Sequence, residues 1–473
     1  MPHPIVEISE LTQVVIDHCL LLGNGRSLAS LACTCRAVEE QALSTLWSEQ
    51  SSLETLIKST LPPGILHPSN PLPGPTDADW DRFRRYASWM RRLVLGRDCF
   101  QSVMSLGLTG GFLCPGLRDL DWSAGRHTFS LHWILLSPKL TRLSLSYSAV
   151  LRPPSERDLS IFRSAIMGLD TSLLQFLSLQ WWITGETDEQ MESLASSVVL
   201  RCGAALEQLW IPAPLSDTAV QHIMQLPNLR AWGEVKCGPP KTPDLTLPTI
   251  FPRLDYLSLS RQVSLEWITF LTTTARRISS GQDSHPPLNH GPVQRLGRLE
   301  AFTSVNLDAV FISPILLFCQ LTSLRLNSDC CPVEGCGFSL TDDDIVEIAT
   351  ALPRLEKALL GIACSHNSCQ TTTASLVSFS THCRDLKHLE FHFNTANIRN
   401  DLESVSTDPR LDGLPSLRTR DTFHLSLSGA PYTIGEDDVM PVLRGFLRIF
   451  PSLNKISGHY APWKDLNLRL REA

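Results

Sequence analysis

Seven copies of the tripeptide Pro-x-Leu that begin a recurring leucine pattern constrain the fold of this 473-residue chain more than any other feature. With the leucine as position zero, apolar residues follow at positions plus three and plus five in most copies. The spacing persists in copies without proline, such as Leu174-Leu177-Leu179. Alternate side chains of a strand point to opposite faces, so these apolar positions share one face. The copies are Pro115–Leu117, Pro138–Leu140, Pro227–Leu229, Pro252–Leu254, Pro353–Leu355, Pro415–Leu417 and Pro451–Leu453.

The spacing L-x-x-L-x-L is typical of leucine-rich repeats, in which each repeat adds one short parallel strand to a shared core. Anchor leucines are separated by 22 to 45 residues, which leaves room for a helix in the longer repeats. Repeats anchored at Leu229, Leu299 and Leu355 match the pattern poorly. We predict an α/β fold: an irregular solenoid of ten or eleven repeats, with parallel strands on a concave face and helices on a convex face.

Helical patterns lie between the anchors, as a strand-turn-helix repeat requires. Thr341 precedes three aspartates, and apolar residues then recur at helical spacing from Ile345 to Leu352. An N-cap hydroxyl, acidic residues in the first turn and an apolar stripe together predict a helix. Proline then bars the residue before it from helical geometry and leaves the chain extended for the next strand. The other expected helices are 155–168, 187–199 and 437–450.

Composition narrows the class of protein. A net charge of −7 without a basic cluster argues against nucleic acid as the main partner. The longest mostly apolar stretch, 310–321, is too short to cross a bilayer. A signal peptide begins with basic residues followed by an apolar run, whereas this chain has Glu7, Glu10 and Asp17 in that region. Fourteen cysteines in so long a chain indicate reduced thiols, so we expect a cytoplasmic or nuclear protein without a membrane partner.

The first sixty residues differ from the repeats, because they lack Pro-x-Leu and show helical periodicity throughout. A proline-rich stretch follows, readable as a semi-rigid spacer. A short helix is expected over Asp79–Leu95, and the C-terminal segment Trp463–Ala473 is expected to close or trail from the last repeat. The predicted division is a helical module at 1–60, a linker at 61–78 and the solenoid at 79–473.

The N-terminal module resembles an F-box, in particular those of the F-box proteins with leucine-rich repeats in mushroom-forming (basidiomycete) fungi. The resemblance lies in Ile8-Ser9-Glu10-Leu11, in the run Ser27–Arg36 and in Ala42-Leu43-Ser44-Thr45-Leu46-Trp47. It implies docking on the Skp-type adaptor of a cullin ubiquitin ligase, with the repeats recruiting a protein substrate. The adaptor-binding residues that it implies are Ile8, Leu11, Val15, Ile16, Leu28, Leu31, Cys35, Leu46 and Trp47.

Two other interpretations of the module stay open. It could be a plain three-helix cap that covers the open end of a solenoid. It could also be an F-box that no longer docks, since Ser9 stands where the family usually has proline. The chain would then be a protein-interaction scaffold without a ligase role.

Repeat geometry predicts the ligand face. If positions plus three and plus five point inward, positions plus two, plus four and plus six lie on the open surface of the strands. A register slip of one residue, or helices packed over this surface, would remove it. The residues expected to bind substrate are Arg142, Phe176, Trp210, Tyr256, Arg325, Lys357, His388 and Glu390.

Signals for catalysis are weak, and we expect neither enzymatic activity nor a cofactor. The chain has no phosphate-binding glycine loop, zinc-protease motif or serine-hydrolase elbow. A metal-dependent enzyme would need a zinc site with an open position, and one cysteine-rich cluster has suitable ligands. That cluster comprises Cys330, Cys331, Cys336, Cys364, His366 and Cys369.

Overall fold

A computed structural model shows two compact units, Met1–Pro214 and Leu215–Ala473, which we call the N-terminal and C-terminal units and describe separately. This boundary is not one that the sequence suggested, and the division at 60 and 78 stays a prediction. The residues that the structure describes are 9–21, 25–34, 36–62, 75–96, 113–124, 135–148, 160, 164, 166–182, 188–241, 250–260, 262–279, 295–303, 307–328, 337–361, 370–391, 393–394, 398–406, 423–427, 438–458 and 461–472.

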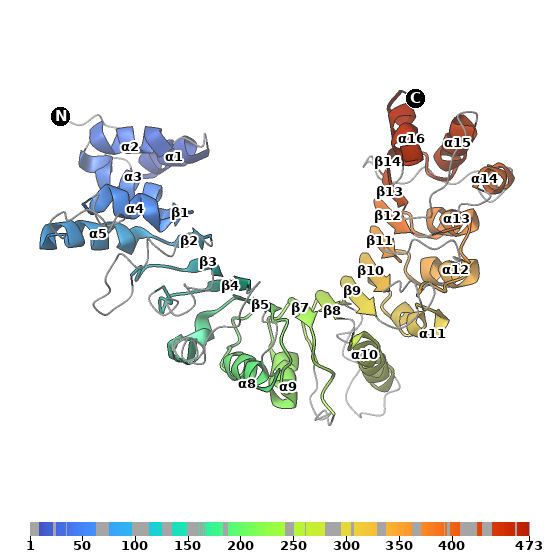
Figure 1. The fold of residues 1–473 in the computed structure, drawn as a ribbon, viewed down its shortest axis with the longest axis horizontal. Helices are drawn as coiled ribbons and strands as arrows, with labels where there is room; N and C mark the ends of the chain where they lie inside the picture. The colour runs from blue at the N-terminus through green and yellow to red at the C-terminus, as the bar shows by residue number, and fades with distance from the viewer. Residues whose placement is uncertain are drawn as a thin grey trace. The chain divides into compact units, whose positions relative to one another are not determined.

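Short strands follow one another in chain order in each unit, and neighbours within a unit pair in parallel (Figure 1). This arrangement confirms the predicted α/β leucine-rich-repeat fold. The N-terminal unit holds β1 (Glu49–Gln50), β2 (Arg92–Leu95), β3 (Asp119–Ala124), β4 (Arg142–Ser148), β5 (Phe176–Trp182) and β6 (Gln208–Trp210). The C-terminal unit holds β7 (Ala231–Val235), β8 (Tyr256–Leu259), β9 (Arg298–Thr303), β10 (Ser323–Ser328), β11 (Lys357–Leu360), β12 (His388–Phe391), β13 (Phe423–Leu427) and β14 (Leu453–Gly458).

Helices precede or connect these strands. In the N-terminal unit they are α1 (Ser9–Leu21), α2 (Gly25–Thr34), α3 (Arg36–Ser48), α4 (Leu53–Thr60), α5 (Asp77–Trp89), the 3-10 turn η5 (Thr171–Leu173) and α8 (Asp188–Val199). In the C-terminal unit they are α9 (Asp217–Gln225), α10 (Ser264–Ser279), α11 (Ala309–Ile312), η7 (Ile315–Leu317), α12 (Asp342–Ala351), α13 (Thr373–His382), α14 (Ile398–Ser406), α15 (Val439–Ile449) and α16 (Ala461–Glu472).

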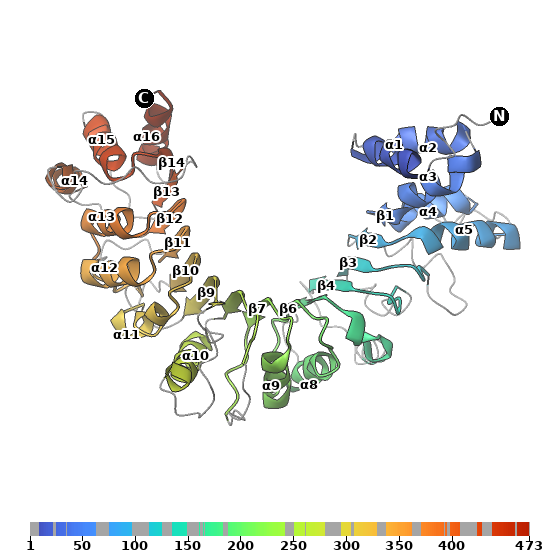
Figure 2. The ribbon, with the colours of Figure 1, turned by 180° about the vertical axis from the view of Figure 1, so that it is seen from behind.

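The sheet of the C-terminal unit is covered on one side. Helices α12, α13 and α15 lie on the same side of β10–β14 when seen from the front and from behind (Figures 1 and 2). We call the opposite side of the strands the strand face. Helix α16 packs against β14, and the Asn467 side-chain oxygen accepts a hydrogen bond from the Ile456 amide at 3.1 Å. The C-terminal helix therefore contacts the last strand, as expected for a segment that closes the solenoid.

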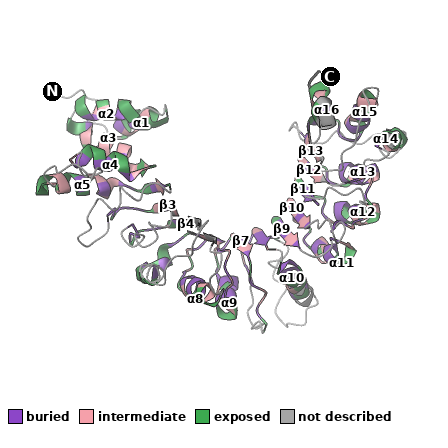
Figure 3. Cartoon of the chain, viewed as in Figure 1, coloured by how far each residue is buried: buried purple, intermediate pink, exposed green. Residues whose placement is uncertain are grey.

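Strand alternation divides the core from the strand face. Leu143 and Leu145 of β4 are buried, whereas Arg142 is exposed and Ser144 is half-buried. The same alternation recurs in β9 and β10, and Figure 3 shows buried positions running along the strands. Burying a leucine side chain contributes roughly 1.5–3 kcal/mol, so a shift of one residue in any strand would be strongly unfavourable.

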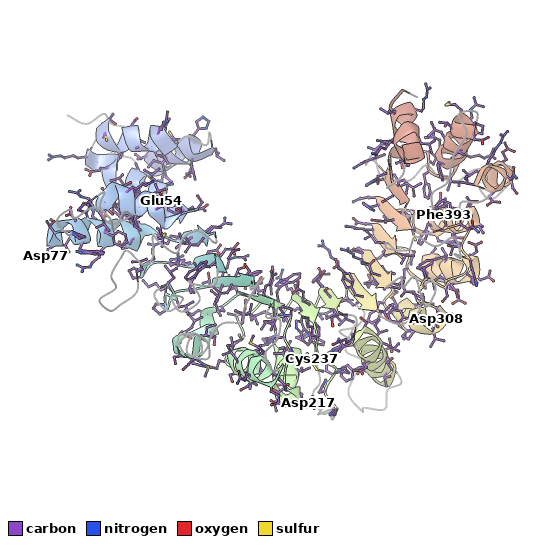
Figure 4. All side chains as sticks on the ribbon, viewed as in Figure 1. Glu54, Asp77, Asp217, Cys237, Asp308 and Phe393 are labelled. Carbon is purple, nitrogen blue, oxygen red and sulfur yellow. The ribbon has the colours of Figure 1, made fainter. Side chains whose placement is uncertain are left out.

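Helix starts follow their sequence signals. Thr341 accepts from the Asp344 amide while the Asp344 carboxylate accepts from the Thr341 amide, which is the reciprocal capping box. Thr76 and Asp79 form the same arrangement at the start of α5. Acidic residues also occupy the first turns of other helices, where they favour the positive end of the helix dipole. Glu54 and Asp217 are examples labelled in Figure 4.

The expected helix over Asp79–Leu95 was wrong in its second half. Helix α5 ends at Trp89, and Arg92–Leu95 form β2, which pairs with β3. Leu93 and Leu95 are buried, so this segment already follows the two-residue alternation of a repeat strand. Pairing with β3 decides the conformation, because a strand of four residues carries too short a pattern to be distinguished from a helix end.

Two anchor assignments were also wrong. Leu299 lies opposite Leu257 and Leu324 in the neighbouring strands, so it occupies position plus three and the buried Leu296 is the anchor. In the next-to-last strand Leu425 lies opposite Leu389, which places β13 five residues beyond the position expected from Leu417. The long insertions before these strands shift the register, and the leucine spacing alone did not reveal it.

The poor repeat anchored at Leu229 has a structural cause. The register of β7 shifts between Trp232 and Val235, so Val235 rather than Glu234 enters the core. Glu234 has φ +57, a left-handed conformation that residues other than glycine seldom adopt. Such a bulge inserts one extra residue into a strand and displaces the apolar pattern by one position.

Candidate functional site

The N-terminal helices pack around a small apolar core. It comprises Ile16, Leu28, Ala32 and Ala42, with Leu31 and Leu46 packed against it. The residues that the F-box resemblance implied for adaptor binding therefore fall into different environments. Ile16, Leu28 and Trp47 are buried, Leu31 and Leu46 are partly buried, Leu11 and Val15 are exposed, and Ile8 and Cys35 lie outside the described residues.

Helix α1 has a second apolar side that faces away from this core. Leu11 and Val15 are each 44% exposed, Val14 is 63% exposed and Leu21 is 84% exposed. At about 100° of rotation per residue these four fall on one side of the helix, Ile16 and Thr12 fall on another, and Leu20, which is 50% exposed, lies apart from the four. We call Leu11, Val14, Val15 and Leu21 the α1 apolar face. Exposed apolar patches are a common feature of protein interaction surfaces.

The core side of α1 is held to α3 by polar contacts. The Gln41 amide donates to the Gln13 side-chain oxygen at 2.6 Å, and Gln13 donates to Asp17 at 2.6 Å. These bonds fix the rotation of α1 about its axis. They keep the α1 apolar face turned outward.

Trp47, at the end of α3, connects the helices to the first repeat. Its ring stacks on Tyr86 of α5 with 5.5 Å between centroids and 11° between planes. Tyr86 contacts Trp89 in turn, at 5.3 Å. Trp47 is 7% exposed, so its apolar area is used within the chain.

Charged side chains on the strands of the N-terminal unit are paired with one another. Glu49, Arg92, Asp119 and Arg142 occupy equivalent positions on successive strands. Asp119 lies 3.6 Å from both arginines, and Arg92 lies 3.9 Å from Glu49. Burial raises the pKa of Asp119, and the two arginines oppose that rise. Arg142 also lies over the Phe176 ring at 4.5 Å, so this row of charges is largely satisfied internally.

The equivalent row in the C-terminal unit has a different composition. Strand register aligns one residue from each of β8 to β14 along the strand face. We call this row the basic row, because its ionisable side chains, apart from Tyr256, are Arg, Lys or His. Its members are Tyr256, Arg298, Ser323, Lys357, His388, His424 and Lys455.

Two histidines lie at the centre of the basic row. The rings of His388 and His424 meet edge to face at 4.5 Å, and His424 Nε2 lies 2.8 Å from the Ser457 hydroxyl. Burial, together with electrostatic interactions with His388 and Lys455, lowers the pKa of His424 to about 4 against the opposite effect of Glu390. His424 is therefore neutral at pH 7. It lies in a locally positive environment.

A second row lies two residues further along the same strands and carries both signs of charge. Glu300 and Arg325 are opposite one another on β9 and β10, and Arg325 lies over the Phe302 ring at 5.4 Å. Burial and the nearby Glu300 carboxylate raise the pKa of Tyr256 to about 12, so its hydroxyl stays protonated. Glu390 and Leu359 continue this row.

The sequence-based list of substrate-binding residues thus falls on the strands of both units. Arg142, Phe176 and Trp210 belong to the N-terminal unit, and Tyr256, Arg325, Lys357, His388 and Glu390 to the C-terminal unit. Lys357 is exposed, and Phe176, Trp210, Tyr256, Arg325, His388 and Glu390 are half-buried. Their role in binding stays a prediction.

Besides Ser323, three members of the basic row were missed from the sequence. Arg298 and His424 belong to the repeats whose anchors were misplaced, and Lys455 follows Leu453 at the plus-two position. For Arg298, the available signal was Leu296, which lies three residues before Leu299 and marks the true anchor of this repeat. For His424 the available signal was the alternation Phe423-x-Leu425-x-Leu427.

Nucleophilic and metal-binding groups are sparse in the described part of the chain. Within those residues no group of three or more His, Cys, Asp or Glu side chains is placed to hold a metal ion. The cysteine-rich cluster, Cys330 to Cys369, lies outside them. Burial raises the pKa of the Cys114, Cys202 and Cys383 thiols to about 12, so these thiols are protonated and poor nucleophiles. None of the helices in the described ranges is long and apolar enough to span a bilayer.

Aromatic side chains fill the core beside β7 and β8. Trp232 meets Trp267 edge to face at 5.2 Å, and the Trp267 indole donates to the Cys237 carbonyl at 2.6 Å; Figure 4 labels Cys237. A nearby pocket is lined by apolar side chains and Thr274. It holds no convergent polar groups of the kind that acid–base catalysis needs.

Comparisons with known proteins assign no family to the chain. No family model matches the chain, and no curated protein matches it. Among solved structures, the chain is similar to an internalin from Listeria monocytogenes, at 14% identity and a TM-score of 0.34. The match covers 78% of this chain and 81% of the internalin.

Proposed function

We propose that this chain is the substrate-recruiting adaptor of a Skp/cullin/F-box type ubiquitin ligase. The N-terminal helices dock on the Skp-type adaptor, and the strand surfaces of the repeats hold a protein substrate. The chain supplies no chemistry and needs no cofactor. It acts by proximity, since a tethered substrate meets the ubiquitin carrier at a high effective concentration. The site of action is the cytoplasm or the nucleus.

The observation that carries this proposal is the α1 apolar face. A plain cap needs only one apolar side on each helix, because its single task is to cover the end of the core. Helix α1 has two, and Leu11 and Val15, which the F-box resemblance implies for docking, lie on the exposed one. A partner that covers these four apolar side chains would explain why the free chain exposes them to water.

The experiment is a pull-down of the purified chain with the Skp-type adaptor of the source organism. The test variant is Leu11→Asp/Val14→Asp, which places two charges on the α1 apolar face. The matched control is Val310→Asp/Leu468→Asp, at exposed apolar positions of α11 and α16 in the C-terminal unit. Circular dichroism checks that both variants keep the helical content of the parent chain.

Binding that is lost in the test variant and kept in the control supports the adaptor function. An intact, folded chain that does not bind the Skp-type adaptor overturns it. We avoid Leu31 and Trp47 as test positions, since both side chains pack inside the chain and their replacement would disturb folding.

The second candidate is a protein-interaction scaffold whose F-box has lost its ligase role. The burial of Ile16, Leu28 and Trp47 favours it, because a cap without a partner would use these side chains in the same way. The pull-down separates the two functions. A scaffold binds proteins through the repeats but does not retain the Skp-type adaptor.

A further inference from the structure

The two units differ in how they neutralise charge on equivalent strand positions. In the N-terminal unit, Arg92 and Arg142 share the Asp119 carboxylate. In the C-terminal unit, Arg298, Lys357 and Lys455 occupy the equivalent row and make no ion pair with any described residue. The positive charge of the basic row is therefore available to a partner.

Nearby carboxylates do not cancel this charge. Glu356 already bonds Lys387 at 3.1 Å, beside the row. Glu300 lies opposite Arg325 in the second row. Two further acids lie near the basic row: Glu390, 3.9 Å from His388, and Asp255, whose carboxylate lies beside Gly297. The basic row therefore carries an excess of positive charge on a chain whose net charge is −7.

The spacing of the basic row suits an extended chain. Neighbouring strands lie about 4.8 Å apart, so the five steps from β9 to β14 span roughly 24 Å. An extended peptide rises about 3.3 Å per residue, and about seven residues cover this distance. Alternate side chains of such a peptide, about 6.6 Å apart, would face the strands.

We propose that the basic row binds an extended acidic segment of a partner protein, which lies across β9–β14 with its Asp or Glu side chains toward Arg298, Lys357 and Lys455. The inference rests on the part of the proposed function in which the strand surface of the repeats recruits a protein. It adds the chemical class of the recruited segment.

Carboxylates fit the row better than a phosphate group does. The cations are single and distributed over six strands, whereas a phosphate site gathers several donors around one point, often with paired arginines. Arg325, the nearest further arginine, lies over the Phe302 ring. Distributed single charges match carboxylates distributed along a peptide.

The test uses the full chain and a fluorescein-labelled peptide of eight residues in which Glu alternates with Ser. Fluorescence anisotropy measures binding at low and at moderate salt. The test variant is Lys357→Glu/Lys455→Glu. The matched control, Arg444→Glu/Lys464→Glu, changes the net charge equally at exposed positions of α15 and α16.

We expect the parent chain and the control to bind the peptide, and the test variant to bind about tenfold more weakly, as follows from reversing two exposed ion pairs. Added salt should weaken the binding of the parent. Equal losses in the test variant and the control would overturn the inference, because they would indicate attraction to overall charge. Equal affinity for a peptide with Gln in place of Glu would also overturn it.

Three further outcomes separate this inference from phosphate recognition and from the proposed function. Binding only to a peptide with phosphoserine in place of Glu would overturn the assignment to carboxylates. If the chain retains the Skp-type adaptor but does not bind the Glu peptide, this inference is refuted and the proposed function stands. If the chain binds the peptide but not the adaptor, the inference stands and the ligase role is refuted.

Discussion

The indole ring of Trp47 stacks on the phenol ring of Tyr86, with 5.5 Å between their centroids. Trp47 ends the three-helix module, and Tyr86 belongs to the helix that precedes β2. The F-box resemblance implied adaptor binding by Trp47, and the residue is 7% exposed. The stack therefore joins the helical module to the first repeats.

Trp47→Ala should lower the free energy of unfolding by about 3–5 kcal/mol, the usual range for removing a buried large aromatic side chain. Trp47→Phe keeps an aromatic ring against Tyr86, so its free energy of unfolding should fall much less. Urea denaturation followed by circular dichroism measures both variants. If Trp47→Ala is as stable as the parent chain, the stack does not hold the module to the repeats.

Asp342 connects two successive repeats. Its carboxylate accepts from the Thr372 amide at 2.8 Å, from the Thr372 hydroxyl at 2.7 Å and from the Ser375 hydroxyl. Asp342→Ala should therefore destabilise the C-terminal unit by about 2–3 kcal/mol, because hydrogen bonds to a charged group are strong and the donors lose their acceptor.

The neighbouring Asp343 is the control for this change, since its exposed side chain lies in the same first turn of α12. Asp343→Ala should lose less than about 1 kcal/mol, the size of a helix-dipole contribution. Thermal unfolding of both variants makes the comparison. Equal losses would show that Asp342 acts only through the dipole of its own helix.

Gly361 has φ +71, and a Cβ added there would lie 2.5 Å from Cδ2 of Phe338, which is buried. Gly361→Ala should thus destabilise the repeat by at least about 1–2 kcal/mol, the strain of the left-handed conformation, with the clash in addition. Gly168→Ala is the control, because no atom lies within 4 Å of its added Cβ. If the Gly361→Ala variant unfolds at the same temperature as the parent chain, this geometry is contradicted.

His424 should make the stability of the C-terminal unit depend on pH. Its folded pKa of about 4 lies below the ordinary value of 6.5, owing to burial and to the charges of His388 and Lys455. Between these two values the unfolded chain binds a proton that the folded chain does not, so stability falls as the pH drops from about 7 toward 4.

His424→Gln removes this titration and should reduce the loss of stability between pH 7 and pH 5. Urea midpoints measured at both pH values give the difference. His382→Gln, at an exposed position in the last turn of α13, is the control. An unchanged pH dependence in His424→Gln would show that other groups are responsible for it.

Sequence patterns that span only a few neighbouring residues predicted much of the fold. The leucine spacing placed most strands and their buried faces, as in Leu143 and Leu145. The Thr341–Asp344 capping box placed the start of α12 to the residue. The signals failed at Arg92–Leu95, where four residues are too few to distinguish strand from helix, and at Leu299 and Leu417, where long insertions displaced the register.

The candidate surfaces were less accessible to sequence reasoning. Leu11, Val15 and Ile16 were all expected at the adaptor, and the packing of Ile16 in one core with Leu28 was needed to show which side of α1 is covered. Likewise, Lys357 was expected on the strand surface, but its alignment with Arg298 and Lys455 depends on how three distant repeats pair.

The sequence by itself determined which side of each regular strand faces the core, and it determined where well-capped helices begin. Both properties depend on residues a few positions apart, so side-chain alternation and hydrogen bonding within one turn suffice to specify them. Only the tertiary structure decided which charges share a row and that the buried Trp47 stacks on Tyr86. These contacts join residues from different repeats or helices, and their register is set by backbone hydrogen bonds between strands and by packing across variable connections.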